Sequence, residues 1–543
     1  MKKLVSRFMA VLMAMAMILS MSMTAFAAED STRLTGTGKL TVNNTVEGKT
    51  LDLYQIFTAT KNGDNVAYTL NSAYEGFFQS KITDASTLTG EALSEKAYAY
   101  VKEQVGETGS NGAAFAKDIL GWILSASGET KTAVESTHST ATTADTKTVI
   151  DNLAYGYYVV YPLGATDTST APGNGTVKSV ASLVSVTGTD ATVNMKSNYP
   201  TVVKKVNNKN ADDVNIGDTV TYTLTSKVPD MTGYTSYVFN FKDTLSAGLT
   251  FKEITSVKVG ETTITKVDAG QEADNTYTLT QDGQNITITM NNFLASNKDK
   301  AGQEINVTYT ATLNKDAVTG YDANKNSATV EYSNKPGTDN KGESEPSIVD
   351  VHTFNFTIFK YYLKGADKTG LANAEFELYK ENAASNAAGD KVNIKKVEEG
   401  VYRVATPEEA AAEGFKSDVI VSGTNGKVLV KGLDAGTYYL RETKAPEGYN
   451  KLLSDIKVEI KATYGEDGKL VSYTVDYTYN GTTTPGTAIT SKDNSPEVAV
   501  ENKTGAQLPS TGSKGALMVT LAGIVLFGVL TASKAFGKKK ANK

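Results

Sequence analysis

The sequence of 543 residues contains no cysteine, two histidines and one tryptophan. Without cysteine, no disulfide can stabilise the chain and no thiolate can bind a metal. His138 and His352 stand alone in the sequence, so they form none of the paired patterns typical of zinc enzymes. A phosphate-binding loop and the nucleophile elbow of hydrolases are also missing. These absences argue against an enzyme, and we expect neither a metal nor a cofactor.

The N-terminal residues have the three parts of a secretory signal peptide. A basic start, Met1-Lys2-Lys3, precedes an apolar run and the small-x-small tripeptide Ala25-Phe26-Ala27. A membrane helix is the rival interpretation, but the run is short and ends in a cleavage-type tripeptide. We therefore expect cleavage after about Ala27 and a secreted protein.

The C-terminal region contains an LPxTG pentapeptide, formed by Leu508, Pro509, Ser510, Thr511 and Gly512. An apolar segment at about 515–536 follows, and a basic tail ends the chain. The segment is long enough to form a transmembrane span, and the terminal lysines would stay on the cytoplasmic side. Pentapeptide, span and tail in this order resemble the cell-wall sorting signal that sortases cut between Thr and Gly. The alternative is a plain tail anchor.

Charge argues against nucleic acid as a partner. The chain has 54 Lys and Arg against 60 Asp and Glu. Three of the basic residues lie in the signal peptide and six follow Thr511, so the remaining chain has 45 basic residues and a net charge of −15. An acidic surface of this size repels the phosphate backbone.

The pattern between the two ends predicts an all-β protein. Short runs rich in Thr, Val and Tyr alternate between polar and apolar residues, which favours tandem immunoglobulin-like β-sandwich modules. Residues 91–125 instead show helical spacing, so the N-terminal module has a helical insertion. The predicted organisation is a signal peptide at 1–27, three domains at 28–197, 198–347 and 348–506, and the sorting signal at 507–543.

Three polar residues of the third predicted domain lie on apolar strand faces, because side chains alternate along a strand. They are Lys360, Glu442 and Asn502. Burial disfavours charge on the amine and on the carboxyl, and a neutral amine is a nucleophile. A protonated Glu could polarise the Asn carbonyl as ammonia leaves. We predict an isopeptide bond between Lys360 and Asn502, assisted by Glu442; the alternative is three polar groups that reach solvent at strand ends.

Two segments of this domain, 372–379 and 436–449, resemble the collagen-adhesin B-type fold. The first reads ANAEFELY, and the second ends in ETKAPEGY. In that family the matching lysine, glutamate and asparagine form an intramolecular bond. The resemblance therefore implies the same pair and the same catalyst.

In the second predicted domain, the same alternation places Lys204, Asp243 and Asn334 on the apolar faces of their strands. Residues 200–249 resemble the fimbrial isopeptide-forming D2 domain of backbone pilins. The resemblance implies a bond between Lys204 and Asn334, with Asp243 as the catalyst. Lys205 is the second candidate for the amine, but the alternation turns its side chain outward.

The first predicted domain departs from the pattern, because Tyr161-Pro162 stands where a B-type module carries its catalytic Glu. We expect no autocatalytic bond there. Lys196 faces outward near the end of this domain and resembles the lysine that pilin sortases use as acceptor. The usual Tyr-Pro-Lys is missing, however, so Lys205 stays open as the second candidate.

These resemblances together imply the major structural subunit of a covalently polymerised pilus anchored to the cell wall. The expected partners are copies of the chain itself, pilus and housekeeping sortases, peptidoglycan and a host surface ligand. Self-modification would be a single turnover, so the protein would not be an enzyme. The alternatives are a monomeric wall-anchored adhesin that binds host matrix, and an ancillary pilin.

Overall fold

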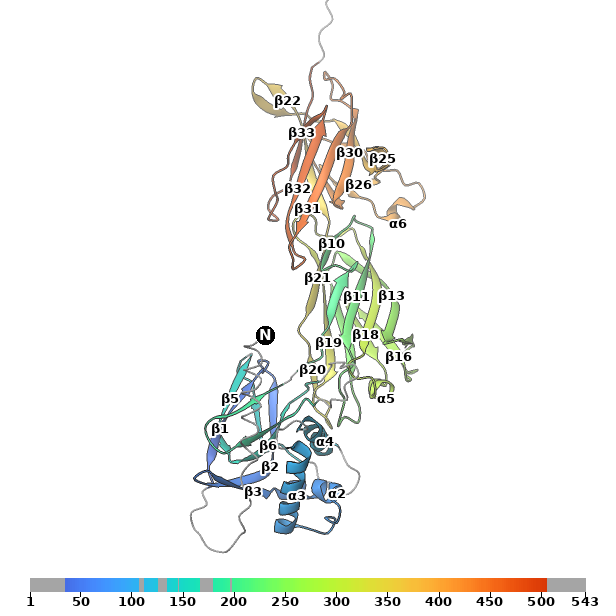
Figure 1. The fold of residues 1–543 in the computed structure, drawn as a ribbon. Helices are drawn as coiled ribbons and strands as arrows, with labels where there is room; N and C mark the ends of the chain where they lie inside the picture. Colours follow the sequence, from blue (N-terminus) through green and yellow to red (C-terminus); the bar gives the residue numbers. More distant parts are fainter. Residues whose placement is uncertain are drawn as a thin grey trace, which may run out of the picture. The chain divides into compact units, whose positions relative to one another are not determined.

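The computed structural model describes residues 35–504 apart from 107–111, 126–133, 145, 167–178 and 196–197. The strands form six sheets, which fall into three consecutive pairs along the sequence (Figure 1). We refer to the pairs as the first module (35–195), the middle module (198–353) and the third module (354–504). The protein is therefore all-β with tandem sandwich modules, as predicted.

The first module pairs a three-stranded sheet, β5-β1-β8, with a sheet ordered β3-β2-β6-β7, in which β4 also pairs with β2. Its strands are β1 (Thr37–Asn43), β2 (Thr50–Asn62), β3 (Asn65–Leu70), β4 (His138–Ala141), β5 (Lys147–Ala154), β6 (Gly156–Pro162), β7 (Ser182–Val186) and β8 (Ala191–Asn194). A hairpin turn joins β2 to β3, and Gly63 adopts the positive φ that this turn requires.

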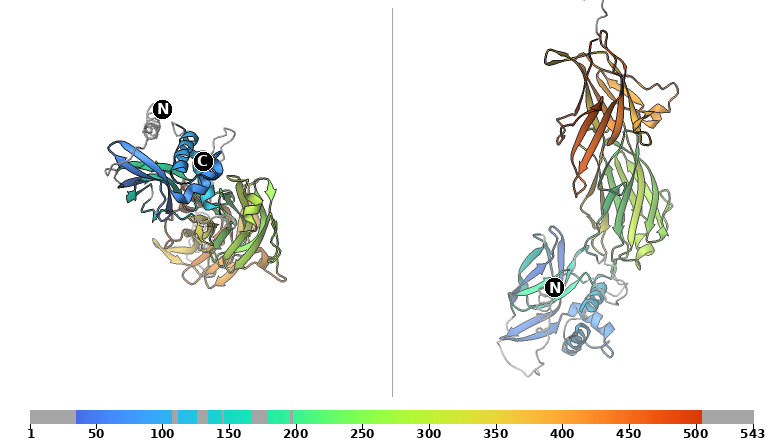
Figure 2. Two further views of the ribbon diagram at one scale, coloured as in Figure 1. Left: turned by 90° about the horizontal axis from the view of Figure 1, so that it is seen from below. Right: turned by 45° about the horizontal axis from the view of Figure 1, so that its top comes forward.

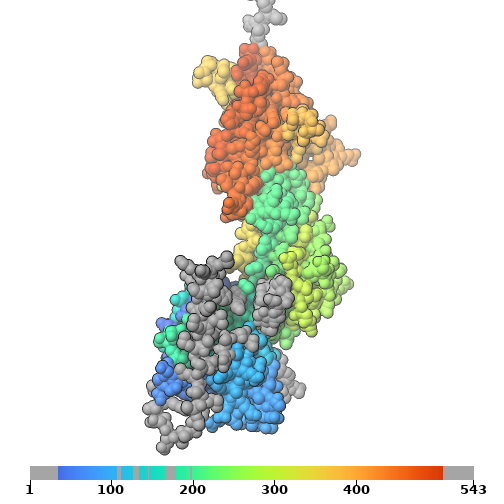
Figure 3. All heavy atoms as spheres, in the orientation of Figure 1, coloured from blue at the N-terminus to red at the C-terminus, as the bar shows by residue number. Residues whose placement is uncertain are grey.

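The helical insertion lies between β3 and β4. It comprises η1 (Ser72–Tyr74), α2 (Glu75–Lys81), α3 (Gly90–Val105) and α4 (Gly112–Leu124). Phe77, Leu93 and Ile119 from these helices join one apolar cluster with Ile56 and Val159 of the sheet. The helices lie together beside the strands in two views, and their atoms form one blue mass in the space-filling view (Figures 2 and 3). The expectation of helices at 91–125 is confirmed.

The middle module is a sandwich of an eight-stranded and a five-stranded sheet. The larger sheet contains β10 (Ala211–Asp213), β12 (Phe239–Leu245), β15 (Thr265–Lys266), β16 (Thr276–Asp282), β17 (Asn285–Met290), β19 (Asn324–Ser333), β20 (Lys341–Glu343) and β21 (Ser347–His352). The smaller one contains β9 (Val203–Val206), β11 (Thr219–Lys227), β13 (Leu249–Val259), β14 (Thr262–Thr263) and β18 (Glu304–Leu313), and a short helix, α5 (Phe293–Asn297), precedes β18.

The strand β21 corrects one predicted boundary. It pairs with β19 and with β10, so it belongs to the middle module. The chain also divides into two compact units, and Thr353 and Phe354 fall in different ones. The predicted boundary after residue 347 was wrong, because the next strand of the middle module follows it directly.

The third module pairs a six-stranded sheet with a seven-stranded sheet. The first contains β22 (Phe354–Lys364), β23 (Asp367–Gly370), β26 (Ile394–Glu398), β27 (Val401–Val404), β29 (Lys427–Leu433) and β34 (Glu497–Glu501). The second contains β24 (Glu375–Asn382), β25 (Ala387–Lys391), β28 (Ile420–Val421), β30 (Gly436–Lys444), β31 (Ile456–Tyr464), β32 (Leu470–Tyr479) and β33 (Thr482–Thr484), and a short helix, α6 (Pro407–Ala410), follows β27.

Within the described ranges, none of the helices has both the length and the apolar character needed to span a membrane. The predicted span at 515–536 lies outside those ranges.

Candidate cross-linking sites in the middle and third modules

Lys360 is a fully buried lysine on the inner face of β22. Every second residue of this strand from Phe354 to Lys360 is buried, as the alternation predicts. The Lys360 Nζ lies 3.0 Å from Oε1 of Glu442, which β30 brings in from the facing sheet. The Phe376 ring centroid lies 5.7 Å from the same nitrogen. The amine therefore lies beside a buried carboxylate and close to an aromatic ring.

Asn502 reaches the same carboxylate from the last strand of the module. β34 pairs in parallel with β22, and the Asn502 backbone N–H donates to the Tyr361 carbonyl at 2.9 Å. The Asn502 Nδ2 donates to Oε1 of Glu442 at 3.2 Å. A single carboxylate oxygen thus contacts both the amine of Lys360 and the carboxamide of Asn502.

The second oxygen of Glu442 fixes the carboxylate in place. Oε2 accepts a hydrogen bond of 2.7 Å from the backbone N–H of Leu452. Burial lowers the pKa of Lys360 to about 8, although the adjacent carboxylate acts in the opposite direction. A lysine with this pKa has a sizeable neutral fraction near neutral pH, and only the neutral amine is nucleophilic.

Lys204 is the corresponding buried lysine of the middle module, on β9. Its Nζ lies 2.5 Å from Oδ2 of Asp243, and both side chains are almost completely inaccessible. The same nitrogen donates to the Tyr309 hydroxyl at 2.8 Å, and the Tyr222 ring centroid lies 5.0 Å away. Burial lowers the pKa of Lys204 to about 8, against the opposing effect of Asp243.

The carboxamide at this site belongs to Asn326, which the sequence did not reveal. Asn326 is fully buried on β19, and its Nδ2 donates to the Tyr309 hydroxyl at 2.7 Å. Oδ1 of Asn326 and Oδ1 of Asp243 are both buried acceptors without a hydrogen-bond partner among the described residues. Unpaired buried acceptors are costly, and a proton on Asp243 would turn one of them into a donor.

The prediction that Asn334 is the partner of Lys204 is contradicted by the strand register. Asp243 lies opposite Ala328 of β19, and Asn334 follows the far end of that strand. The six residues from Ala328 to Asn334 span about 20 Å at the usual rise of a strand. Asn334 instead packs closely against Gly164, where an added Cβ would lie 2.8 Å from the Asn334 Cβ.

The first module shows no such arrangement within the described residues. Tyr161 and Pro162 end β6, and the buried polar side chains of the module include Asp52 and Gln55 but no lysine. The expectation that this module forms no cross-link stays a prediction. The predicted signal cleavage point at Ala27, the predicted acceptor Lys196 and the pentapeptide at 508–512 lie outside the described residues.

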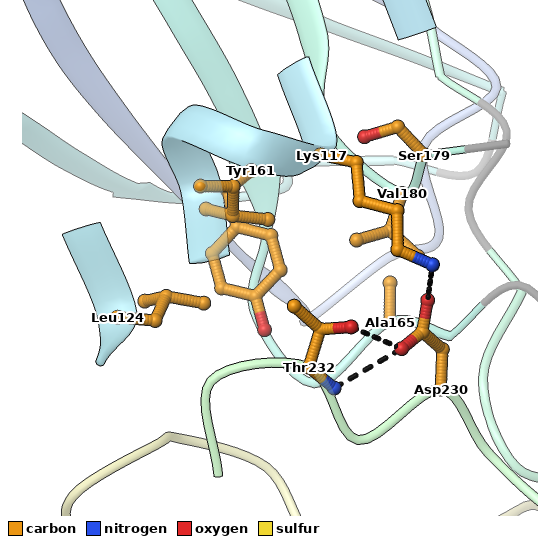
Figure 4. Close-up of a pocket in the computed structure, with 9 residues that line it drawn as sticks. Lys117, Leu124, Tyr161, Ala165, Ser179, Val180, Asp230 and Thr232 are labelled. Atoms are coloured by element: carbon orange, nitrogen blue, oxygen red, sulfur yellow. Dashed lines mark hydrogen bonds and ion pairs between the residues drawn. The ribbon is translucent and has the colours of Figure 1, made fainter. Parts of the chain in front are cut away.

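A small pocket lies beside α4 (Figure 4). Asp230 contributes its main polar group, but that carboxylate already lies 3.3 Å from the Lys117 Nζ and accepts the Thr232 hydroxyl at 2.6 Å. Both oxygens of the Asp230 carboxylate therefore already contact protein groups. Across the part of the chain that the structure describes, no group of three or more His, Cys, Asp and Glu residues could hold a metal ion.

Two family matches fall within the middle and third modules. Residues 216–336 match the family described as Gram-positive pilin backbone subunit 2, Cna-B-like domain. Residues 360–475 match the prealbumin-like fold domain of the SpaA family. These two regions of the chain are therefore similar to domains of Gram-positive pilins.

Two curated proteins are similar to this chain over much of its length. The fimbrial subunit type 2 of Actinomyces naeslundii is 26% identical over 371 residues, which cover 65% of this chain and 63% of the relative. The trypsin-resistant surface T6 protein of Streptococcus pyogenes serotype M6 is 26% identical over 340 residues, which cover 56% and 52%. The chain thus spans less than two thirds of the length of these relatives.

Solved pilin structures are also similar to the chain. The T6 backbone pilin of Streptococcus pyogenes matches with a TM-score of 0.45 and 18% identity, covering 89% of this chain and all of that one. The major pilin SpaD of Corynebacterium diphtheriae matches with a TM-score of 0.40 and 18% identity, over the same shares.

Proposed function

We propose that the chain is the shaft subunit of a covalently polymerised pilus and that its middle and third modules each form an internal isopeptide bond. The observation that carries the proposal is the meeting of a buried lysine, a buried carboxyl and a buried carboxamide in both modules. Lys360, Glu442 and Asn502 form one set, and Lys204, Asp243 and Asn326 form the other. The family matches to pilin domains support the same conclusion.

Each bond would form by attack of the neutral lysine Nζ on the Cγ of the asparagine. The carboxyl, in its protonated form, donates to the carbonyl oxygen as negative charge develops there. One proton leaves Nζ, the carboxamide nitrogen leaves as ammonia, and an amide joins the two side chains. No oxidant or cofactor is consumed. The product replaces a buried amine by a neutral amide, which removes the cost of burying a charge.

Polymerisation would use the ends of the chain. Sortase would cleave after Thr511 and transfer its carbonyl to Lys196 of another copy, and a housekeeping sortase would attach the final subunit to peptidoglycan. The protein would then be secreted, retained at the cell surface and assembled with copies of itself. Host surface ligands would be contacted by the assembled fibre.

Intact mass spectrometry of the recombinant chain tests the internal bonds. We expect a mass lower than the sequence mass by two ammonias, one for each module. Tryptic mapping should recover the Lys360 and Asn502 peptides as one linked species. Recovery of these peptides as separate species would overturn the cross-linking.

Extraction of the cell wall with muramidase tests the polymer separately. A shaft subunit gives a ladder of masses above the monomer on a denaturing gel, because the links between copies are covalent. A single band would instead support a monomeric wall-anchored adhesin. Replacement of Lys196 by arginine should abolish the ladder while both internal bonds still form; a persisting ladder would move the acceptor role to another lysine.

A further inference from the structure

The hydroxyl group of Tyr309 contacts all three reacting groups of the middle module. It donates to Oδ2 of Asp243 at 2.8 Å, and it accepts from the Lys204 Nζ at 2.8 Å. It also accepts from the Asn326 Nδ2 at 2.7 Å. One donation and two acceptances use the full hydrogen-bonding capacity of a phenol. The oxygen is therefore the common neighbour of amine, carboxyl and carboxamide.

The ring of Tyr309 is held firmly between neighbouring strands. Tyr309 is buried on β18 and lies opposite Tyr222 of β11, with the two rings stacked at a centroid distance of 5.1 Å. Phe251 of β13 approaches the ring from another direction, at 5.8 Å. Burial, together with the nearby Asp243 carboxylate, raises the pKa of Tyr309 well above its ordinary value. The phenol stays protonated at neutral pH and can donate.

The third module has no equivalent hydroxyl among its described contacts. There, Oε1 of Glu442 contacts Lys360 and Asn502 directly, and the ring beside the lysine is Phe376. In the middle module the acid is an aspartate, which is one methylene shorter. Its Oδ2 contacts the Lys204 Nζ and the Tyr309 hydroxyl. The Tyr309 hydroxyl fills the position between them.

We propose that Tyr309 is a catalytic residue for cross-linking in the middle module, and that its hydroxyl relays a proton from the Lys204 Nζ to the departing Nδ2 of Asn326. This inference rests on the proposed isopeptide chemistry. The Lys204 Nζ attacks Cγ of Asn326 and forms the new N–C bond. The phenol oxygen then accepts a proton from Nζ and donates its own proton to Nδ2. Ammonia then leaves, the amide forms, and Tyr309 ends in its starting protonation state. Asp243 remains free to polarise the carbonyl.

The test compares two bonds in one molecule. The wild-type chain and the Tyr309→Phe variant are made by cell-free synthesis and quenched at intervals in acid and denaturant. The linked Lys204–Asn326 peptide is then measured against the linked Lys360–Asn502 peptide. We expect the variant to form the middle bond about 100-fold more slowly, the scale of a lost proton transfer, while the third-module bond forms at the wild-type rate.

Tyr332→Phe is the matched control, because it changes another buried tyrosine of the same module, which pairs with Phe239 and lies along β19 from the position opposite Asp243. It should form both bonds at the wild-type rate. Equal rates of the middle bond in Tyr309→Phe and the wild type would overturn the role of Tyr309 alone. Failure of the wild type to form either bond would overturn the proposed cross-linking as a whole.

Biosynthetic replacement of tyrosine by fluorotyrosine separates proton transfer from positioning, and it covers the case in which Tyr309→Phe does not fold. The fluorinated ring keeps its place and its hydrogen bonds, but its hydroxyl is more acidic. A proton relay predicts a changed ratio of the middle-bond rate to the third-bond rate. An unchanged ratio would overturn the relay.

Discussion

The middle and third modules bring the same three chemical groups together through different topologies. In the third module, Lys360 lies on β22, and Asn502 directly follows β34, the parallel neighbour of β22 in the same sheet. In the middle module, Lys204 lies on the five-stranded sheet, and Asn326 lies on the eight-stranded sheet that faces it. One bond would join two strands of a sheet, and the other would join two sheets.

If both proposed bonds form, this difference would mean that the chemistry depends on the burial and contacts of the groups, and not on a fixed strand pairing. A carboxyl lies beside the lysine in both sites, at 3.0 Å in the third module and 2.5 Å in the middle one. Both lysine pKa values are lowered to about 8 by burial. What varies is the path from carboxyl to carboxamide, which is direct from Glu442 and runs through Tyr309 in the middle module.

The largest effect should follow removal of the carboxyl in the third module. Glu442→Ala should leave the bond unformed and Lys360 buried without a partner, while the middle bond still forms. The proposed cross-link closes a loop of about 140 residues between Lys360 and Asn502, and its loss costs about 5 kcal/mol of unfolding free energy. Chemical denaturation should show at least this loss of unfolding free energy. Glu377→Ala is the control, since its surface pair with Lys391 is worth about 0–1 kcal/mol.

The choice between two asparagines tests the register of the middle module. Asn326→Ala should reduce the mass deficit from two ammonias to one and lower the unfolding free energy by about 5 kcal/mol. Asn334→Ala should keep the full deficit, because its side chain lies far along β19 from Lys204. The opposite pattern in the intact masses would restore the assignment made from sequence.

A pH effect should separate an unlinked lysine from a linked one. In Asn502→Ala, Lys360 stays free, with a folded-state pKa of about 8 against the usual 10.5. Between these values the unfolded chain holds a proton that the folded chain has released, so stability rises with pH, by up to about 3 kcal/mol. Below about pH 8 the full cost of the buried charge is present. The Lys360→Met change in the same background should abolish this rise, as followed by denaturation across the pH range.

The smallest effect is expected at Lys205, the neighbour of Lys204. Its side chain bonds to Asn210 at the surface. Lys205→Ala should keep both internal bonds and change the unfolding free energy by no more than about 0.5 kcal/mol. Loss of one ammonia from the measured deficit would show that Lys205, and not Lys204, supplies the amine.

Alternation along single strands was enough to predict much of this arrangement. It placed Lys360, Glu442 and Asn502 on buried faces, and the structure brings all three together. The helical period likewise predicted α3 and α4. Both signals are local, so they can be read without knowing how strands pair.

Alternation could not select the correct asparagine on β19. Asn326 and Asn334 have the same parity, so both point toward the same side of the strand. Only the pairing of Asp243 with Ala328 decides which one lies level with Lys204, and pairing depends on contacts distant in sequence. Tyr309 was missed for the same reason. Alternation along its strand indicates a buried side chain but does not indicate which residues its hydroxyl contacts.

The parallel neighbours β22 and β34 determine how a pulling force would pass through the third module. The chain enters this module at Phe354 and leaves it just after Asn502. With an amide between Lys360 and Asn502, the load path would run from Phe354 to Lys360 and cross directly to the exit. The residues between the two ends of that amide would carry no load, so the module could lengthen only by straightening the few residues before Lys360. It would behave as a nearly inextensible link, whose strength is that of covalent bonds.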